Sequence, residues 1–153
     1  MENKNEPTVV RSNRALKANN FRTLLNERIK FESKVEILVN EFCDFIDKQG
    51  YDKKRVLYYK NALGLFNRFI SAFDIKDLTQ VTRAMASSSF IRFMNKGVYV
   101  YYSFDKTKQR YRTDFSIKIK EFFMFLHTHK NISNTKVLKA LCSKQELKGL
   151  QIK

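Results

Sequence analysis

Residues 55–70, RVLYYKNALGLFNRFI, carry the strongest helical pattern in the chain. Apolar residues recur there at steps of three and four, and the spacing continues to Phe73. Asp52 lies just before the stretch, where a carboxylate commonly caps a helix. The predicted core-facing residues are Val56, Tyr59, Ala62, Leu63, Phe66, Phe69, Ile70 and Phe73. A long amphipathic helix must bury such a stripe against other helices, so this stretch predicts a helical bundle.

The segment before it, residues 33–50, has the same spacing in SKVEILVNEFCDFIDKQG. Ser33 followed three residues later by Glu36 is typical of a reciprocal N-terminal cap, and Gly50 is a C-terminal stop signal. The apolar stripe comprises Val35, Leu38, Val39, Phe42, Phe45 and Ile46. The pattern therefore predicts a helix that begins near Ser33 and ends near Gly50.

Two helices are predicted downstream of the connector that follows Phe73. Thr82 is a suitable cap for RAMASSSFIRFMNKG, which closes at Gly97, and the serines at 87–89 predict a bend or a frayed turn. Residues 111–129 then resume helical spacing. The apolar residues of this second helix are Phe115, Ile119, Phe122, Phe123 and Leu126.

Two shorter segments differ from these helices. Val98 to Ser103 alternate β-branched and aromatic residues, which predicts a small β-hairpin or extended insertion near 98–104. Residues 134–150, NTKVLKALCSKQELKGL, predict a short helix broken at Cys142 and Ser143.

The predicted fold is therefore all-α, with about four main helices in a compact bundle and a short helical tail. The connections are mostly short, which makes neighbouring helices antiparallel. We expect residues 1–31 to form a basic N-terminal arm with a short helix, residues 32–130 to form the helical domain, and residues 131–153 to form the tail.

Length and composition narrow the class of protein. A chain of 153 residues with 43% hydrophobic content suits one folded domain. No apolar run reaches the roughly 18 residues that cross a bilayer, so no membrane partner is expected. The polar N-terminus predicts a cytoplasmic protein. Cys43 and Cys142 are far apart and neither belongs to a CxxC pair, so both are expected to pack as free thiols.

Charge points to the partner. Thirty Lys and Arg against 15 Asp and Glu leave a net charge of +15, which attracts polyanions and releases counterions from phosphates. A role in solubility, or codon bias, is the alternative interpretation. The charge is uneven, because residues 96–153 contain 13 bases and only 4 acids. That placement favours nucleic acid.

The order of the motifs resembles the N-terminal core-binding domain of tyrosine recombinases of the phage integrase type. RVLYYKNALGLFNRFI is similar to the family's TYxxxLxxFxxFL, DLTQVTRAMASSSFIRFM to LTxxDIxxFLxxL, and KQRYRTDFSIKIKEFFMFL to TxNRxLSALRxFFxFL. Residues 33–128 cover that domain in the same order. The chain departs from the family at Ala84, where an acid is usual, and in its long aromatic YVYYSF insertion. The resemblance implies a SAM-like bundle that binds duplex DNA as half of a clamp, through its second and fourth helices.

Strand exchange in that family requires a second domain, which carries the tyrosine nucleophile, two arginines, and Lys and His residues. The chain ends at LCSKQELKGLQIK, similar to the opening of that second domain. Tyr111 between Arg110 and Arg112 does not replace it, because successive helical residues point in different directions and no base is near. His127 and His129 diverge on a helix, as ordinary residues near its end. We therefore expect no enzymatic activity, no metal and no cofactor.

Basic residues on two predicted helices are the candidate DNA contacts. Residues 106–120 hold six bases and one acid, and the resemblance implies that this helix and the start of the second helix face DNA. Gln109 and Arg112 would approach base edges while the others contact phosphates. A solvated helix face is the alternative. The predicted DNA-binding residues are Lys53, Lys54, Arg55, Tyr58, Lys60, Lys106, Lys108, Gln109, Arg110, Arg112, Lys118 and Lys120.

The leading hypothesis is a non-catalytic DNA-binding protein of phage or mobile-element type, acting as a repressor or a recombination accessory factor. Its partners would be double-stranded DNA and a recombinase or regulatory protein. Two alternatives stay open: a protein–protein interaction module that uses the bundle and its Tyr-rich insertion (Tyr99, Tyr101 and Tyr102), and the N-terminal fragment of a longer recombinase. RNA also stays open, because a basic face binds either nucleic acid. The oligomeric state is not predicted.

Overall fold

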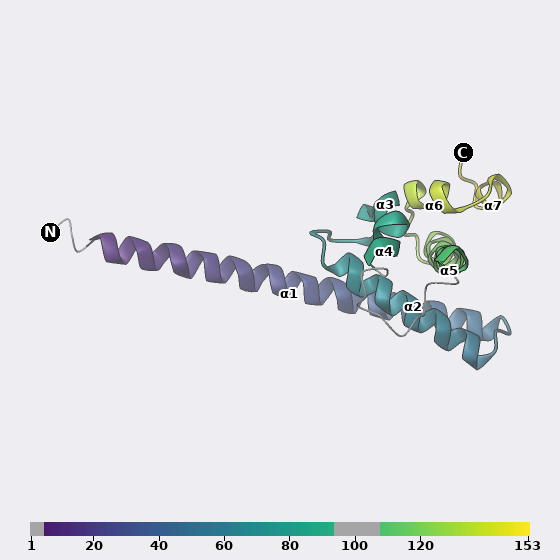
Figure 1. The fold of residues 1–153 in the computed structure, drawn as a ribbon, viewed down its shortest axis with the longest axis horizontal. Coiled ribbons are helices and arrows are strands. Elements are labelled where there is room, and N and C mark those ends of the chain that lie inside the picture. Colours follow the sequence, from purple (N-terminus) through teal and green to yellow (C-terminus); the bar gives the residue numbers. More distant parts are fainter. Residues whose placement is uncertain (1–4, 94–107) are drawn as a thin grey trace.

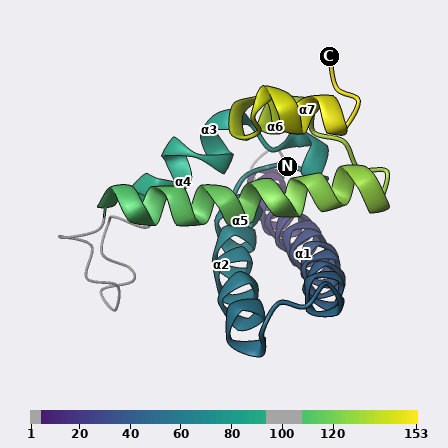
Figure 2. The same ribbon diagram turned by 90° about the vertical axis from the view of Figure 1, so that its right-hand side faces the viewer.

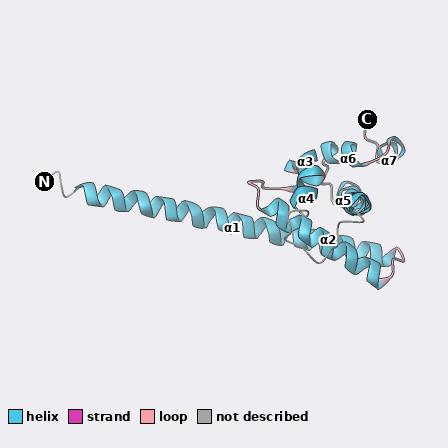
Figure 3. Ribbon diagram, in the orientation of Figure 1, coloured by secondary structure: helices cyan, strands magenta, loops and turns pink. Residues whose placement is uncertain are grey.

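The computed structural model describes the backbone of residues 5–93 and 108–153, and side chains for residues 20–93 and 114–153. These residues form seven α-helices and one short 3-10 helix, and the described part contains no strand (Figure 3). The all-α prediction is therefore confirmed. The hairpin or extended insertion predicted near 98–104 lies outside the described residues.

Helix α1 (Asn5–Lys48) is 44 residues long and projects from one side of the bundle (Figure 1). The predicted start at Ser33 is wrong, because the helix continues through it. Neither Gly nor Pro interrupts the chain between Pro7 and Gly50, and proline is tolerated in a first turn. Gly50, at φ +96°, ends the helix as predicted. Residues 20–30 are exposed, and burial begins at Phe31.

Helix α2 (Lys53–Ser71) returns antiparallel along the C-terminal part of α1. Its predicted cap is confirmed, because the Asp52 carboxylate accepts a hydrogen bond from the backbone N–H of Arg55 at 2.7 Å. The predicted stripe is confirmed as well. Its most buried residues, Leu63, Phe66 and Ile70, are at most 1% exposed.

The connector forms a 3-10 helix, η2 (Leu78–Gln80), followed by α3 (Arg83–Ala86) and α4 (Ser88–Phe93). Thr82 caps α3 by accepting a hydrogen bond from the backbone N–H of Met85 at 3.1 Å. The predicted bend is confirmed at Ser87, whose φ and ψ of −136° and −94° lie outside the helical region.

Helix α5 (Lys108–His129) crosses the α1–α2 hairpin, and α6 (Thr135–Leu141) and α7 (Lys144–Gly149) lie along its other side (Figure 2). The predicted break at Cys142 and Ser143 is confirmed, and the Ser143 side chain caps α7 together with Glu146.

The core between these helices is rich in phenylalanine. Phe66 of α2 lies 5.4 Å, between ring centroids, from Phe90 of α4 and 6.3 Å from Phe123 of α5, both edge-on. Phe42 of α1 contacts Phe122 of α5 at 5.7 Å. These contacts fix α5 across the hairpin and so position the basic helices relative to each other. Among the described helices, none combines the length and the apolar character that crossing a bilayer requires.

Candidate nucleic-acid interface

The first turns of α2 carry the most accessible of the predicted DNA-binding residues. Lys53, Lys54, Arg55 and Tyr58 are all exposed. Asp52 already binds a backbone N–H at this helix start. A phosphate here would therefore be held by the basic side chains rather than by the helix terminus.

A cluster of aromatic and charged side chains fastens the start of α2 to the middle of α5. The Tyr59 hydroxyl donates to Glu121 Oε2 at 2.8 Å, and the Tyr51 hydroxyl donates to the same oxygen at 3.4 Å. Burial, and then the hydrogen bond to Glu121, raise the pKa of Tyr59. The guanidinium carbon of Arg55 lies 4.1 Å from the centroid of the Tyr51 ring. Arg55 is thus held at the α2–α5 junction by a cation–π contact.

Lys118 does not lie on the exposed face of α5 where the sequence placed it. The residue is only 8% exposed, and its ammonium lies 2.9 Å from Asp114 Oδ2 and 5.3 Å from the centroid of the Tyr59 ring. Position 118 is three and four residues from the buried Phe115 and Phe122, and therefore shares their side of the helix. Because it is buried and paired with Asp114, the Lys118 ammonium is not free to contact a phosphate.

Lys120 is also occupied within the protein. Its ammonium lies 2.9 Å from Glu146 Oε2, which ties α5 to α7. The pKa of Glu146 is lowered, first by the backbone N–H of Ser143 and then by Lys120. Lys120 therefore acts in the structure as a link to the tail.

The remaining predicted residues of α5 are placed only in part. Lys106 lies outside the described residues. Lys108, Gln109, Arg110 and Arg112 belong to the first turns of α5, and their side chains lie outside the described part. Their role in DNA binding stays a prediction.

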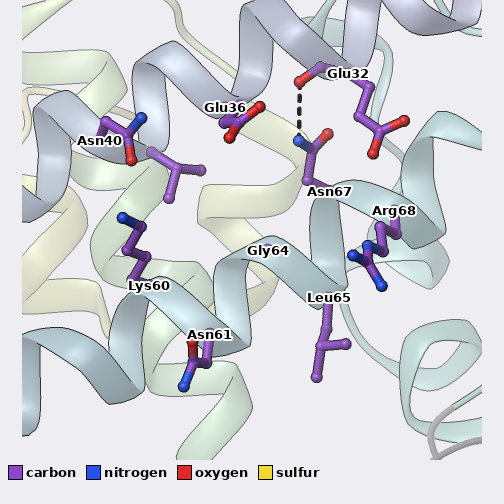
Figure 4. A pocket seen from close by; sticks show the side chains of 10 residues that line it. Glu32, Glu36, Asn40, Lys60, Asn61, Gly64, Leu65, Asn67 and Arg68 are labelled. Atoms are coloured by element: carbon purple, nitrogen blue, oxygen red, sulfur yellow. Dashed lines mark hydrogen bonds between the residues drawn. The ribbon is translucent and has the colours of Figure 1, made fainter.

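Lys60 lines a groove between α1 and α2 and points toward α1 (Figure 4). The groove also contains Arg68 and the acids Glu32 and Glu36, so its charge is mixed. Asn67 closes one end by donating a hydrogen bond to the backbone carbonyl of Glu32 at 2.9 Å. Such a mixture of charges does not favour phosphate. Lys60 also lines a second groove together with Lys53 and the acids Asp44 and Asp47, so it borders the basic start of α2 in surroundings of mixed charge.

The tail adds basic residues that were not singled out in the sequence. Lys136 and Lys139 of α6 and Lys144 and Lys148 of α7 are exposed, while the tail's one acid, Glu146, is bonded to Lys120. The excess of bases after residue 96 was the signal in the sequence. The sequence did not show which of these bases are exposed. The fold shows it, because the apolar sides of α6 and α7 pack on the bundle and leave the lysines on the outside.

The histidines have structural partners. The ring nitrogens of His127 lie 2.7 Å from Ser133 Oγ and 3.0 Å from the Leu150 carbonyl oxygen, and His129 packs on Phe45 and Phe125. Within the part of the chain that is described, no cluster of His, Cys, Asp or Glu could hold a metal ion.

The structure thus brings together the exposed bases of α2 and the middle of α5, joined through Glu121. The Tyr51–Tyr59–Glu121 cluster left no signal in the sequence, since Glu121 lies 70 positions from Tyr51 and 62 from Tyr59. No protein-family model, curated protein or solved structure matches the chain.

Proposed function

We propose that the chain is a non-catalytic DNA-binding protein built on a domain of the recombinase core-binding type, acting as a repressor or a recombination accessory factor. The observation that carries this proposal is the exposed basic surface of Lys53, Lys54 and Arg55. The ion pairs of the described residues use Lys118, Lys120 and Lys130 instead. The net charge of +15 and the helix order add support.

Salt dependence tests this surface. The double variant Lys53→Ala/Lys54→Ala should bind duplex DNA more weakly at every sequence tested. The slope of log affinity against log salt, which is negative, should become shallower by about 2, since each phosphate contact releases roughly 0.9 of a counterion. Fluorescence anisotropy on a labelled duplex at several salt concentrations gives both quantities.

The matched control is Arg68→Ala/Lys76→Ala, which removes the same charge from exposed bases near the C-terminal end of α2 and in the connector after it. We expect its salt slope to stay near that of the unchanged protein. Equal slopes for both double variants would place the interface elsewhere. Titration with single-stranded DNA and structured RNA in the same format compares the nucleic acids directly.

The non-catalytic part of the proposal has its own test. Incubation with a nicked suicide duplex should give no covalent protein–DNA adduct and no joined product, as judged by denaturing gels. The reason is that the Arg110–Tyr111–Arg112 run offers successive helical residues with divergent directions and no adjacent base. An adduct lost in Tyr111→Phe would show that the chain is a nuclease or recombinase after all.

An apolar protein interface is the second candidate function, and the same titration separates it. Binding of a protein partner through buried apolar surface would change little between low and moderate salt, whereas phosphate binding weakens steeply.

A further inference from the structure

The N-terminal part of α1 leaves the bundle and exposes an apolar stripe. From Asn5 to Lys30 the helix extends for about 39 Å at 1.5 Å per residue, beyond the contacts of α2 (Figure 1). Phe21 is 67% exposed, Leu24 46%, Leu25 45% and Ile29 53%. These four residues lie within nine positions of each other, whereas the exposed apolar residues elsewhere in the described part are scattered. Apolar residues gathered in this way mark an interaction surface.

The spacing of the stripe is symmetric. Phe21, Leu25 and Ile29 are four residues apart, and so form one ridge on the helix. If a second copy of the ridge is laid against it in the opposite direction, Leu25 meets Leu25, and Phe21 meets Ile29 twice. A two-fold interface requires this self-complementarity.

We propose that two copies of this chain associate through the N-terminal part of α1, antiparallel, about a two-fold axis at Leu25. A helix of this kind gains little stability on its own in water, because isolated helices depend on packing of an apolar face. Pairing supplies that packing for both copies.

Charge selects the antiparallel direction. Each chain carries a net charge of +15, of which residues 31–153 contribute +11. A parallel pair would place the two bundles side by side, where their like charges repel. An antiparallel pair about Leu25 places the two bundles on opposite sides of the axis, each beginning at Phe31, about 9 Å along the helix from the axis. The apolar contact then forms without setting the two basic bundles side by side.

A groove at the base of the projecting helix extends the same surface. It is lined by Leu24 and Ile29 of α1 together with Ile37, Phe73 and Ile75, where α1 leaves the bundle. In the antiparallel pair, the N-terminal end of each α1 runs toward the base of the other copy's helix. The groove would therefore be covered by the partner helix. The pairing does not require DNA, so it stands or falls separately from the proposed function.

Sedimentation of the full chain tests the pairing. At about 100 µM protein, well above a micromolar Kd, the chain should sediment as a dimer of twice its 18.2-kDa mass. Leu25→Asp should sediment as a monomer, since two carboxylates would face each other at the axis. Its bundle should still unfold in a cooperative thermal transition, while the helical circular dichroism of the whole chain falls because the unpaired N-terminal part of α1 loses its packing. Leu57→Asp is the matched control, because Leu57 is a 53% exposed leucine on α2. It should remain dimeric.

Disulfide cross-linking tests the axis. In a Cys142→Ser background, Cys43 is kept, because burial raises the pKa of its thiol to about 11 and leaves it unreactive. Under a mild copper–phenanthroline oxidant, Leu25→Cys should cross-link to itself. Phe21→Cys should cross-link to Ile29→Cys in a mixture of the two variants. Neither variant should form a cross-linked dimer by itself, because residue 21 faces residue 29 and not a second residue 21. A monomeric wild-type chain, or self-cross-linking by Phe21→Cys, overturns the proposal.

Discussion

Replacing Phe66 with alanine should lower the free energy of unfolding by about 3–5 kcal/mol, as large truncations in protein cores do. Phe66 is 1% exposed and lies between Phe90 of α4 and Phe123 of α5. Its loss removes two edge-on aromatic contacts and opens a cavity where three helices meet. Urea titration followed by circular dichroism measures the change, with the slope of the transition checked for two-state behaviour.

Leu57→Ala on the same helix is the control for this result. Leu57 is 53% exposed, and its truncation should change the free energy of unfolding by no more than about 0.5 kcal/mol. Both substitutions place alanine in α2, so the effect on helix propensity is small in each case. If the two variants were equally stable, the packing of α2 against α4 and α5 would be incorrect.

The sequence predicted α2 well because the cap, the apolar spacing and the preceding glycine all indicate the same helix. Asp52 caps the helix, the apolar spacing runs through Phe66, and Gly50 separates it from α1. The breaks at Ser87 and at Cys142–Ser143 were also predictable, because serine competes for backbone hydrogen bonds and so favours helix ends.

Helix α1 shows why local signals fail. Ser33 and Glu36 have the spacing of an N-terminal cap, but the residues before them also form helix without penalty, and a cap acts only where a helix begins. A polar, basic composition led to the expectation of an arm with a short helix. Basic and polar residues have helix propensities that allow a long helix, so the composition did not limit its length. The evenly spaced apolar residues Phe21, Leu25 and Ile29 also lay within that segment.

The sequence predicted that α5 is rich in basic residues, but not which of those residues are free of ion pairs. Lys118 and Lys120 were selected with their neighbours, yet one is paired to Asp114 and the other to Glu146. The first partner lies four residues away on the same helix. The second lies in α7 and is brought near by the docking of the tail, which periodicity alone does not specify. The exposed bases of α2 required no such information, because they precede the apolar stripe.

The second large effect is expected at Asn134, which joins the connector to the tail. Its side-chain N–H groups donate to the carbonyl oxygens of Leu78 at 2.9 Å and Val81 at 2.8 Å, and its oxygen caps α6 by accepting from Val137 at 3.1 Å. The residue is 3% exposed. Asn134→Ala removes a cap and leaves two buried carbonyls without these donors, so the free energy of unfolding should fall by about 2–4 kcal/mol. Asn61→Ala, an exposed asparagine on α2, serves as the control for loss of an amide.

Asn134→Asp distinguishes the donor role from the cap. The carboxylate keeps the acceptor for Val137 but turns its other oxygen toward the carbonyls of Leu78 and Val81, which repel it. That repulsion and burial should raise the pKa of the new carboxyl group in the folded state above its unfolded value. The folded state then binds more protons between the two pKa values, so stability should rise as pH falls through the raised folded pKa. Asn134→Ala, which has no group to titrate there, should show no such rise. Thermal melts of the two variants from pH 7 to pH 4 make the comparison, and parallel pH curves would mean that the two amide donors do not hold the connector to α6.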